Sequence, residues 1–410
     1  MATDCLVIGA GPAGLTAALS AALAGRSVLV LEKNDRPGRK LLLTGGGRCN
    51  LADPTRPALE ALPAYGRGGR FLRDALAHFD LGEFLHLLEV RTEFDGTDGR
   101  TYVQGGASRM LSAFIEATSR RGVRLVTGCK VKKVGATGTD GFQVRAVPGE
   151  VFEARRLIVA TGGVSYRATG SSGDGYAWAE AFGHTIDEPR AALGELATVP
   201  EFAELAGLTV PGVVLTAFVG KRKAGERVGT LLFTHHGVSG PAAVDLSLDI
   251  VRAGHTEEAE LRIDFLPGVT RDELLAGVLG KPGCRTGKAL EDSGLPARLV
   301  RELVRLAEIE PAQPVAQVSH KKLRALVEAL KTTRLGVRGL TDPDVGVVTA
   351  GGVATRDIEP RTMESRRVPG LYFAGEVLSP AGTCGGYNLL AAFATGWLAG
   401  AAGQMHAPPD

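Results

Sequence analysis

The sequence has few cysteines, little net charge and no long hydrophobic run. Its 410 residues include five cysteines, none of them in a CxxC pair. This odd number argues against a disulfide framework or a structural zinc site and is typical of the reducing cytosol. The 47 Lys and Arg residues nearly balance the 45 Asp and Glu residues. A net charge of +2 therefore does not indicate a protein that binds nucleic acid or an anionic membrane.

Other features that are missing narrow the class of protein. The apolar stretch from Leu15 to Leu23 is too short to span a bilayer. No basic n-region precedes the first strand-like run, so we expect no signal peptide. The histidines are scattered, so we expect no metal site. These absences predict a cytoplasmic enzyme with a small-molecule substrate and with no membrane or nucleic-acid partner, and they leave the oligomeric state open.

A dinucleotide-binding fingerprint begins at Gly9. The glycines follow the spacing Gly9-x-Gly11-x-x-Gly14, after the apolar run 5–8 and at the start of a helical stretch over 12–25. A second apolar run, 27–31, ends on Glu32. In this βαβ context the glycines admit a pyrophosphate at a helix N-terminus, and the acid accepts from a ribose hydroxyl. The carboxylate argues against a ribose 2′-phosphate in this site.

A second glycine-rich signature lies near the C-terminus. The strand-like run 371–374 leads into Gly375 and Glu376, which places an acid at the carboxyl edge of a strand. The loop 385–388 then opens a final apolar helix over 388–400. The N-terminus of that helix would face the N1/O2 region of a flavin, which becomes negative on reduction. Together the two signatures predict a flavoprotein that binds FAD.

The chain between these signatures has two different patterns of predicted secondary structure. Helices are predicted over 71–88, 107–121 and 174–182, among strands over 123–126, 130–134 and 142–147 and a further β run over 157–163. From about residue 191, strand-like alternation (213–219, 230–233, 260–265) gives way to charged amphipathic helices (271–278, 296–306, 321–331). Nucleotide-fold signals resume at 345–352, starting with Val345. We therefore expect a discontinuous α/β domain, 1–190 and 341–410, interrupted by an insert over 191–340.

Several strings of the sequence resemble one bacterial family. They are Gly38-Arg39-Lys40 through Gly45-Gly46-Gly47-Arg48-Cys49-Asn50, Ala160-Thr161-Gly162-Gly163, the segment 233–241, and 349–353 through 385–388. In order and over nearly the whole chain, they are similar to the BaiN-like NAD(P)/FAD-dependent oxidoreductases, some of which are labelled aminoacetone oxidase family FAD-binding enzymes. The resemblance implies a Rossmann-like FAD-binding domain of the two-dinucleotide-binding type. It also implies an inserted β-barrel (about 191–268) and a small helical subdomain (about 269–334).

The resemblance also implies which residues hold FAD, without a covalent bond. Those expected at the pyrophosphate are Gly9, Gly11, Pro12, Ala13 and Gly14; at the adenosine ribose Glu32 and Lys33; and along the pyrophosphate, ribityl chain and ring Arg39, Lys40, Thr44, Gly46, Gly47, Arg48, Cys49 and Asn50. Val131 is expected at the adenine, Ala160, Thr161 and Gly162 over the adenosine half, and Gly375, Glu376, Gly386, Tyr387, Asn388 and Leu389 at the ribityl and pyrimidine end. The cations of the 36–50 loop suit a pyrophosphate, although a solvated loop would look the same.

The candidate catalytic residues are His235, His236 and Cys49. In a strand, two adjacent histidines face opposite sides, so only one of them can face a given site. That histidine is a candidate proton donor, and the alternative is a histidine that closes a turn before Gly237. Cys49 and Cys384 both lie in glycine-rich loops near the expected flavin. They are either a redox-active pair or small cysteines packed against the cofactor.

These residues predict an FAD-dependent oxidoreductase that transfers a hydride through flavin N5 in a cleft between the FAD domain and the insert. No second complete βαβ fingerprint occurs, so NAD(P)H, as a candidate donor, would bind transiently in the substrate cleft. One alternative is an oxidase of the amine or aminoketone type that uses O2. Another is a non-catalytic flavin-bearing redox sensor, or a flavoprotein that acts on tRNA. The sequence does not identify the substrate.

Overall fold

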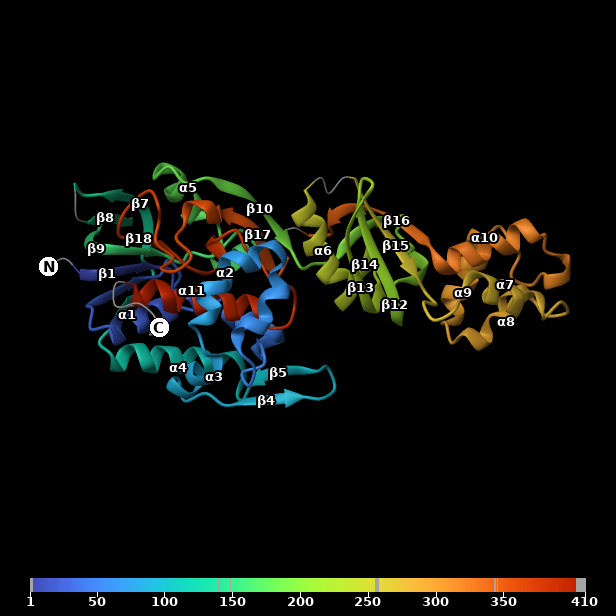
Figure 1. Ribbon diagram of the computed structural model, residues 1–410, viewed down its shortest axis with the longest axis horizontal. Coiled ribbons are helices and arrows are strands. Elements are labelled where there is room, and N and C mark those ends of the chain that lie inside the picture. Colours follow the sequence, from blue (N-terminus) through green and yellow to red (C-terminus); the bar gives the residue numbers. More distant parts are fainter. Residues whose placement is uncertain are drawn as a thin grey trace, which may run out of the picture. The chain divides into compact units, whose positions relative to one another are not determined.

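The computed structural model describes residues 3–138, 141–147, 149–254, 258–342, 344 and 346–402. The chain divides into two compact units (Figure 1). Unit 1 comprises Met1–Ala191 and Val347–Asp410, and unit 2 comprises Ala192–Gly346. Val345, the first residue of the predicted run 345–352, lies outside the described residues.

Unit 1 is built on a seven-stranded sheet in the order β6-β2-β1-β9-β8-β7, with β18 beside β9. The strands are β1 (Thr3–Ile8), β2 (Val28–Leu31), β6 (Arg124–Val126), β7 (Lys130–Ala136), β8 (Phe142–Val147), β9 (Val151–Val159) and β18 (Leu371–Phe373). The pairs of β1 with β2 and with β9, and of β18 with β9, are parallel. All four residues of β2 are buried, as expected for a parallel sheet covered on both faces.

The two ends of the chain meet in a helix pair of unit 1. Helices α1 (Pro12–Leu23) and α11 (Tyr387–Ala401) lie side by side (Figure 1). A Cβ at Gly396 or Gly400 would lie only 2.3 Å from the carbonyl oxygen of Ala13 or Ala17, so glycine permits this close approach. Neither helix, nor any other helix in the described part of the chain, is long and apolar enough to cross a membrane.

The remaining elements of unit 1 surround the sheet. They are α2 (Gly69–Ala77), α3 (Leu81–Leu87), α4 (Gly106–Arg120) and α5 (Asp174–Ala181), a small sheet of β3 (Asn50–Leu51), β5 (Arg100–Val103) and β4 (Thr92–Asp95), and the pair β10 (Ile186–Ala192) with β17 (Val348–Val353). The single helix predicted over 71–88 is wrong. The chain breaks after Ala77, and Asp80 caps a new helix by accepting from the backbone N–H of Glu83.

Unit 2 contains a closed barrel in the order β11-β14-β13-β12-β15-β16. Its strands are β11 (Leu196–Val199), β12 (Thr209–Val219), β13 (Arg222–Phe233), β14 (Gly237–Ser239), β15 (Ala259–Asp264) and β16 (Thr333–Leu340). Helices α7 (Arg271–Leu279), α8 (Thr286–Ala289), α9 (Ala297–Leu306) and α10 (His320–Lys331) lie at one end of this barrel (Figure 1).

Two features of unit 2 differ from the sequence prediction. The barrel does not end near residue 268, because β16, which follows the helices in sequence, pairs with both β11 and β15 and closes it. Helix α6 (Pro241–Ala253) was not predicted. It begins with proline at its first position, where the missing N–H costs nothing, and packs against β13. The strand-like alternation around it concealed this helix.

Candidate FAD site

The N-terminal glycines have two different roles: Gly9 and Gly14 allow close contacts within the chain, and Gly11 leaves space for a ligand. Gly9 has a φ of +104°, and a Cβ there would lie 2.4 Å from the carbonyl oxygen of Ala160. A Cβ on Gly14 would lie 1.9 Å from the carbonyl oxygen of Gly9. Both positions are therefore restricted by the chain itself. A Cβ on Gly11, in contrast, would meet no chain atom within 4 Å, and no side chain caps α1, which leaves a cradle at the helix N-terminus for a pyrophosphate.

Glu32 lies directly after β2 and is buried, with 7% of its surface exposed. Its Oε2 accepts from the backbone N–H of Ala10 at 2.8 Å. Its Oε1 accepts from the backbone N–H of Asn34 at 2.8 Å and from Asn34 Nδ2 at 2.7 Å. The carboxylate thus fixes the fingerprint loop, and Oε2 keeps a lone pair for a ribose hydroxyl. The backbone N–H of Cys129 donates to the Glu32 carbonyl, which brings the start of β7, with Val131, to the same edge.

The predicted cations of the 33–50 segment have partners within the chain. Lys33 pairs with Asp174 at 2.7 Å. The guanidinium of Arg39, which is exposed, donates to Asn34 Oδ1 at 3.2 Å. Arg48 pairs with Asp95 at 2.7 Å, and its guanidinium carbon lies 3.6 Å from the ring centroid of Tyr102. These partners compete with a phosphate, so contact between the cations and the pyrophosphate stays a prediction.

Arg48 belongs to a glycine loop held by the β4–β5 hairpin. Gly46 and Gly47 have positive φ, and a Cβ on Gly46 would meet nothing within 4 Å, so the backbone there is open to a ligand. Thr44 donates its hydroxyl to the carbonyl of Leu41 within the loop. Asn50 pairs with Tyr102 in the register of β3 with β5.

Cys49 is fully buried and has a φ of +57°. Burial raises the pKa of its thiol to about 11, despite a hydrogen bond with Thr44 that lowers it. At neutral pH this group is a thiol rather than a thiolate, which favours the packed cysteine over the redox-active one. Cys384 is partly buried and is also not in a disulfide.

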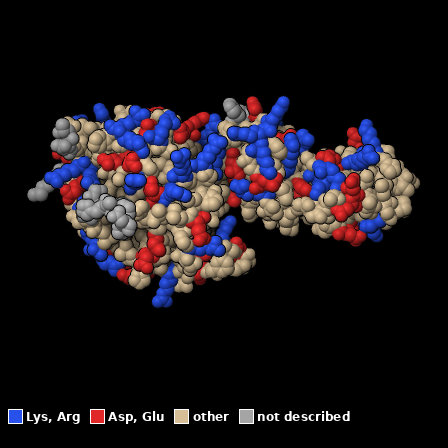
Figure 2. Space-filling model, viewed as in Figure 1, with Lys and Arg blue, Asp and Glu red and all other residues tan. Residues whose placement is uncertain are grey.

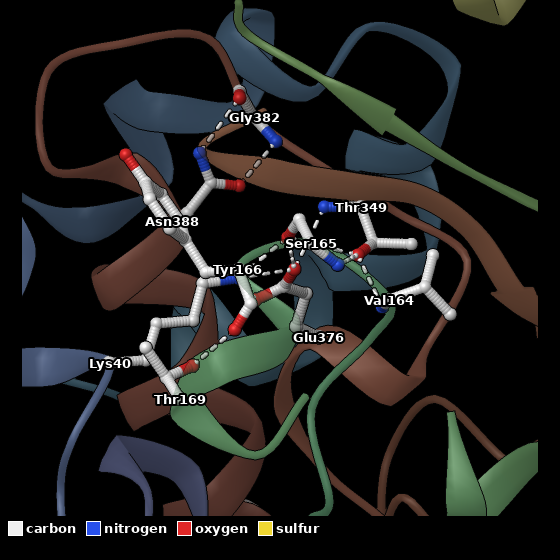
Figure 3. A network of polar contacts seen from close by, with 9 residues as sticks. All are labelled: Lys40, Val164, Ser165, Tyr166, Thr169, Thr349, Glu376, Gly382 and Asn388. Atoms are coloured by element: carbon white, nitrogen blue, oxygen red, sulfur yellow. Dashed lines mark hydrogen bonds and ion pairs between the residues drawn. The ribbon is translucent and has the colours of Figure 1, made fainter. Parts of the chain in front are cut away.

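Lys40 and Glu376 form the centre of a polar network that sequence analysis did not predict (Figure 3). Lys40 Nζ lies 2.8 Å from Glu376 Oε1 and 2.7 Å from Oε2, and it also donates to Ser165 Oγ at 2.7 Å. These bonds use all three donors of the ammonium group. Ser165 Oγ and the backbone N–H of Thr349 donate to Glu376 Oε1 at 2.9 and 2.8 Å.

The network determines the charge of Glu376. Burial by itself would raise the pKa of this carboxyl, but the charge of Lys40 and the hydrogen bonds from Lys40, Ser165 and Thr349 outweigh it and lower the pKa. Glu376 is therefore ionised at neutral pH, and its Oε2, which has Lys40 as its one partner among the described residues, can accept from a ribityl hydroxyl. A Cβ on the neighbouring Gly375 would lie 2.5 Å from Ala13 Cβ, so the network lies beside the first turn of α1.

Two network residues were missing from the sequence prediction. Ser165 and Thr349 are both fully buried, and the Thr349 hydroxyl accepts from the backbone N–H groups of Val164 and Ser165 at 2.9 and 3.2 Å. The sequence did contain an indication of Ser165 and of Thr349. Thr349 opens one of the family strings, and Ser165 follows the string 160–163 by two residues.

The segment after β9 carries the predicted adenosine contacts. Ala160 donates its backbone N–H to the carbonyl of Ile8, and Gly162 has a φ of +74°. Thr161 Oγ1 and the hydroxyl of Tyr176 are buried and have no hydrogen-bond partner among the described residues. An unpartnered buried hydroxyl next to the fingerprint loop fits a site built for a further polar group.

The C-terminal loop is shaped by its own side chains. Asn388 accepts from the backbone N–H of Gly382 at 2.7 Å and donates to its carbonyl at 2.8 Å (Figure 3). Tyr65 donates its hydroxyl to the carbonyl of Tyr387, and Leu389 is buried. Gly386 has a φ of +82° and packs against the backbone of Leu51, and no side chain caps the N–H groups in the first turn of α11. Contact of these residues with the flavin stays a prediction.

His235 and His236 lie in unit 2, but not in a strand. Both are exposed residues of the turn between β13 and β14, so the expectation that they face opposite sides of a strand is wrong. The backbone N–H of Thr234 donates to the carbonyl of Gly237 and closes this turn. Thr234 also donates its hydroxyl to Glu195 at 2.8 Å. The imidazoles are free to meet solvent or a substrate, and their catalytic role stays a prediction.

Taken together, the residues at the carboxyl ends of β1, β2, β9 and β18 fit FAD. The open cradle at Gly11 would take the pyrophosphate, Glu32 the ribose, Glu376 the ribityl chain and the α11 N-terminus the ring. Because β1 lies between β2 and β9 in the sheet, these groups meet along one edge although they come from distant parts of the sequence.

Comparisons with known proteins agree with this geometry. A model of the HI0933-like protein Rossmann domain matches residues 3–402. The 3-dehydro-bile acid delta(4,6)-reductase of Clostridium scindens is 34% identical over 97% of this chain and 98% of its own. The ribosomal RNA dihydrouridine synthase of Escherichia coli is 32% identical over 96% of both chains. A 3-ketosteroid dehydrogenase structure from Rhodococcus jostii shares the fold, with a TM-score of 0.51 and 18% identity over 98% of this chain and 97% of that one.

These matches confirm both the predicted Rossmann-type α/β fold and the predicted family. Since the family model spans nearly all of the chain and two relatives exceed 30% identity over almost their whole length, the chain belongs to the HI0933-like Rossmann family of FAD-dependent oxidoreductases.

Proposed function

We propose that this protein reduces a carbon–carbon double bond conjugated to a carbonyl group, with NAD(P)H as the electron donor. The observation that carries the proposal is the chemistry shared by the names of relatives that match this chain over nearly their whole length. A 3-dehydro-Δ4,6 bile acid has double bonds conjugated to its 3-oxo group, and the C5=C6 bond of uridine is conjugated to its C4 carbonyl. In both compounds the reduction adds a hydride to one carbon and a proton to the other, while NAD(P)H becomes NAD(P)⁺.

Different residues of the candidate site would bind FAD and donate the proton. FAD, when bound, supplies the hydride-carrying N5 of its ring. Gly11 and the N-terminus of α1 provide the cradle for the pyrophosphate, and Glu376 is held ionised for the ribityl chain by Lys40. The candidate sources of the proton are His235 and His236, which are exposed. Cys49 is a weaker candidate, because its thiol is fully buried and burial raises its pKa to about 11.

A small molecule is the favoured substrate. Side chains of both signs occur across the visible face of each unit (Figure 2), and the whole chain carries only +2. Strong binding to RNA requires several clustered cations. The second candidate, a uridine in RNA, is favoured by the Escherichia coli relative, which is similar over nearly the whole length of both chains.

Anaerobic stopped-flow mixing with the purified, FAD-loaded protein tests the proposal. We expect NADH or NADPH to bleach the flavin absorbance and a 3-oxo-Δ4 steroid, added second, to restore it. Restoration by uridine-containing RNA instead would establish the second candidate. Reduction by an amine, followed by reoxidation with O2 and no response to the steroid or to RNA, would show an oxidase. No response to any donor would leave the redox sensor and overturn the proposal.

A further inference from the structure

The segment that joins β9 to α5 makes a series of contacts with the segment that follows β2. We call residues 163–174 the strap. Near its start, Ser165 bonds to Lys40 and Glu376 (Figure 3). In its middle, the carbonyl of Thr169 accepts from Asn34 Nδ2 at 3.1 Å. At its end, Asp174 pairs with Lys33 at 2.7 Å, and Ser172 also accepts from Lys33.

The topology shows what these contacts span. The strap follows β9, and Lys33, Asn34 and Lys40 follow β2. In the sheet, β1 lies between β2 and β9 and is parallel to both. Contacts between the two segments must therefore cross the carboxyl end of β1, where Gly11 and the uncapped N-terminus of α1 form the pyrophosphate cradle. A ligand in a crevice of this kind binds outside the carboxyl ends of the strands.

Residues with positive φ bend the backbone of the strap towards Asn34. Tyr166, Gly170 and Gly173 have φ values of +52°, +107° and +79°. The Thr169 hydroxyl donates to the carbonyl of Tyr166 and stabilises the bend between them (Figure 3). A Cβ at Gly170 would lie 2.6 Å from Asn34 Nδ2, and its φ of +107° would strain any other residue, so glycine suits this close approach.

We propose that Lys33, Asn34 and Asp174 form a latch that closes the strap over bound FAD and sets the rate at which FAD leaves. Each of these contacts joins two parts of the chain, and in this proposal the latch residues make no contact with FAD. Weakening the latch therefore lowers the barrier to binding and to release alike, and it leaves the equilibrium affinity nearly unchanged. Residues that touch FAD behave differently, because their loss raises the dissociation constant. Lys33, predicted from sequence to be a ribose ligand, has the role of a positioning residue in this proposal.

The test compares Asp174→Asn and Lys33→Met with the unchanged FAD-loaded protein. The dissociation rate is measured by exchange of bound FAD against excess labelled FAD, and the dissociation constant by equilibrium dialysis. The salt bridge is partly buried, with 25% and 30% of the two side chains exposed. Loss of one charge-assisted bond of this kind corresponds to about a tenfold faster exchange. We expect that acceleration with a dissociation constant changed by less than about twofold.

Controls distinguish a latch from a general loss of stability. Glu89→Gln removes an exposed salt bridge to Arg120 in the same unit and should leave both quantities unchanged. Reversing the pair, Lys33→Glu with Asp174→Lys, should restore slow exchange. Trypsin provides a second readout that needs no FAD exchange, since Arg167 lies within the strap and is exposed. Cleavage there should be faster in both single variants.

Two results overturn the latch. If exchange and the dissociation constant rise in parallel, Lys33 or Asp174 is a direct ligand of FAD. If neither exchange nor cleavage at Arg167 changes, the pair is an ordinary surface salt bridge. Because these readouts do not involve the substrate, the latch and the proposed reductase activity can fail independently.

Discussion

Replacing Lys40 by Met should destabilise unit 1 in a way that depends on pH. Removing one partner of a fully buried ion pair costs about 3–5 kcal/mol, because the other charge is left unpaired. Lys40 and Glu376 are 21% and 23% exposed, so water screens part of that charge. We therefore expect a loss of about 2–3 kcal/mol near neutral pH, equivalent to a melting temperature lower by roughly 5–10 °C for a unit of this size.

The direction of the pH effect follows from the pKa of Glu376. Its pKa is lowered from 4.5 in the folded protein, so the ionised carboxylate stabilises the fold above that pH, and the contribution is lost as the pH falls below it. In Lys40→Met the charge and the hydrogen bond of Lys40 are gone, so burial, which raises the pKa of Glu376, is opposed only by the hydrogen bonds from Ser165 and Thr349. The pKa of Glu376 is therefore higher in the variant than in the unchanged protein, and the deficit should shrink as the pH falls from neutral towards 4.5.

Thermal unfolding of the FAD-free protein, followed by tryptophan fluorescence, measures this loss in unit 1, because both tryptophans, Trp178 and Trp397, belong to that unit. The double variant Lys40→Met/Glu376→Gln should be more stable than Lys40→Met alone, because it leaves no buried unpaired charge. Arg120→Met, in an exposed pair of the same unit, is the matched control and should cost less than about 1 kcal/mol. Single-variant effects that add within about 0.5 kcal/mol, or a deficit that is constant with pH, would refute the reasoning.

Three further predictions follow from single sites. Gly11→Ala should weaken FAD binding by at least about tenfold without loss of stability in FAD-free protein, since the added methyl group meets no chain atom and the φ of −82° suits alanine; unchanged affinity in dialysis would place the pyrophosphate elsewhere. Burial lowers the pKa of His184 below 6.5, so stability should fall as the pH drops through about 6.5, because the unfolded chain takes up the proton first; the same pH slope in His184→Gln would contradict this assignment. His235→Gln and His236→Gln should leave FAD content and melting temperature unchanged, because both side chains are exposed; turnover lowered in one of them would assign the proton donor, and normal turnover in both would remove the turn from the mechanism.

Features that depend on the local backbone could be predicted from the sequence. The spacing of Gly9, Gly11 and Gly14 between two apolar runs implies a strand, a tight turn and a helix, because the path of the chain requires glycine at positions 9 and 14 and a ligand explains it at position 11. The same reasoning identified Glu32 at the end of β2 and the start of α11. These assignments need few neighbours, since the requirement for glycine and the alternation of buried residues are properties of a short segment.

Partners of charged side chains required the tertiary structure. Lys40 and Glu376 are separated by 336 positions in the sequence, and their contact exists because β18 joins the sheet beside β9 and α11 packs on α1. For the same reason the sequence presented Arg48 as a loop cation, whereas the β4–β5 hairpin provides Asp95 and the ring of Tyr102 as its neighbours.

Burial and strand order were also decided by the tertiary structure. The sequence of Cys49 and its neighbours does not reveal that the thiol is fully enclosed, which is what raises its pKa. The last strand of the barrel follows four helices in the sequence, so no local pattern links it to β11 and β15. A periodic segment specifies its own element, but its neighbours are chosen by which arrangement buries the apolar faces of the whole unit together.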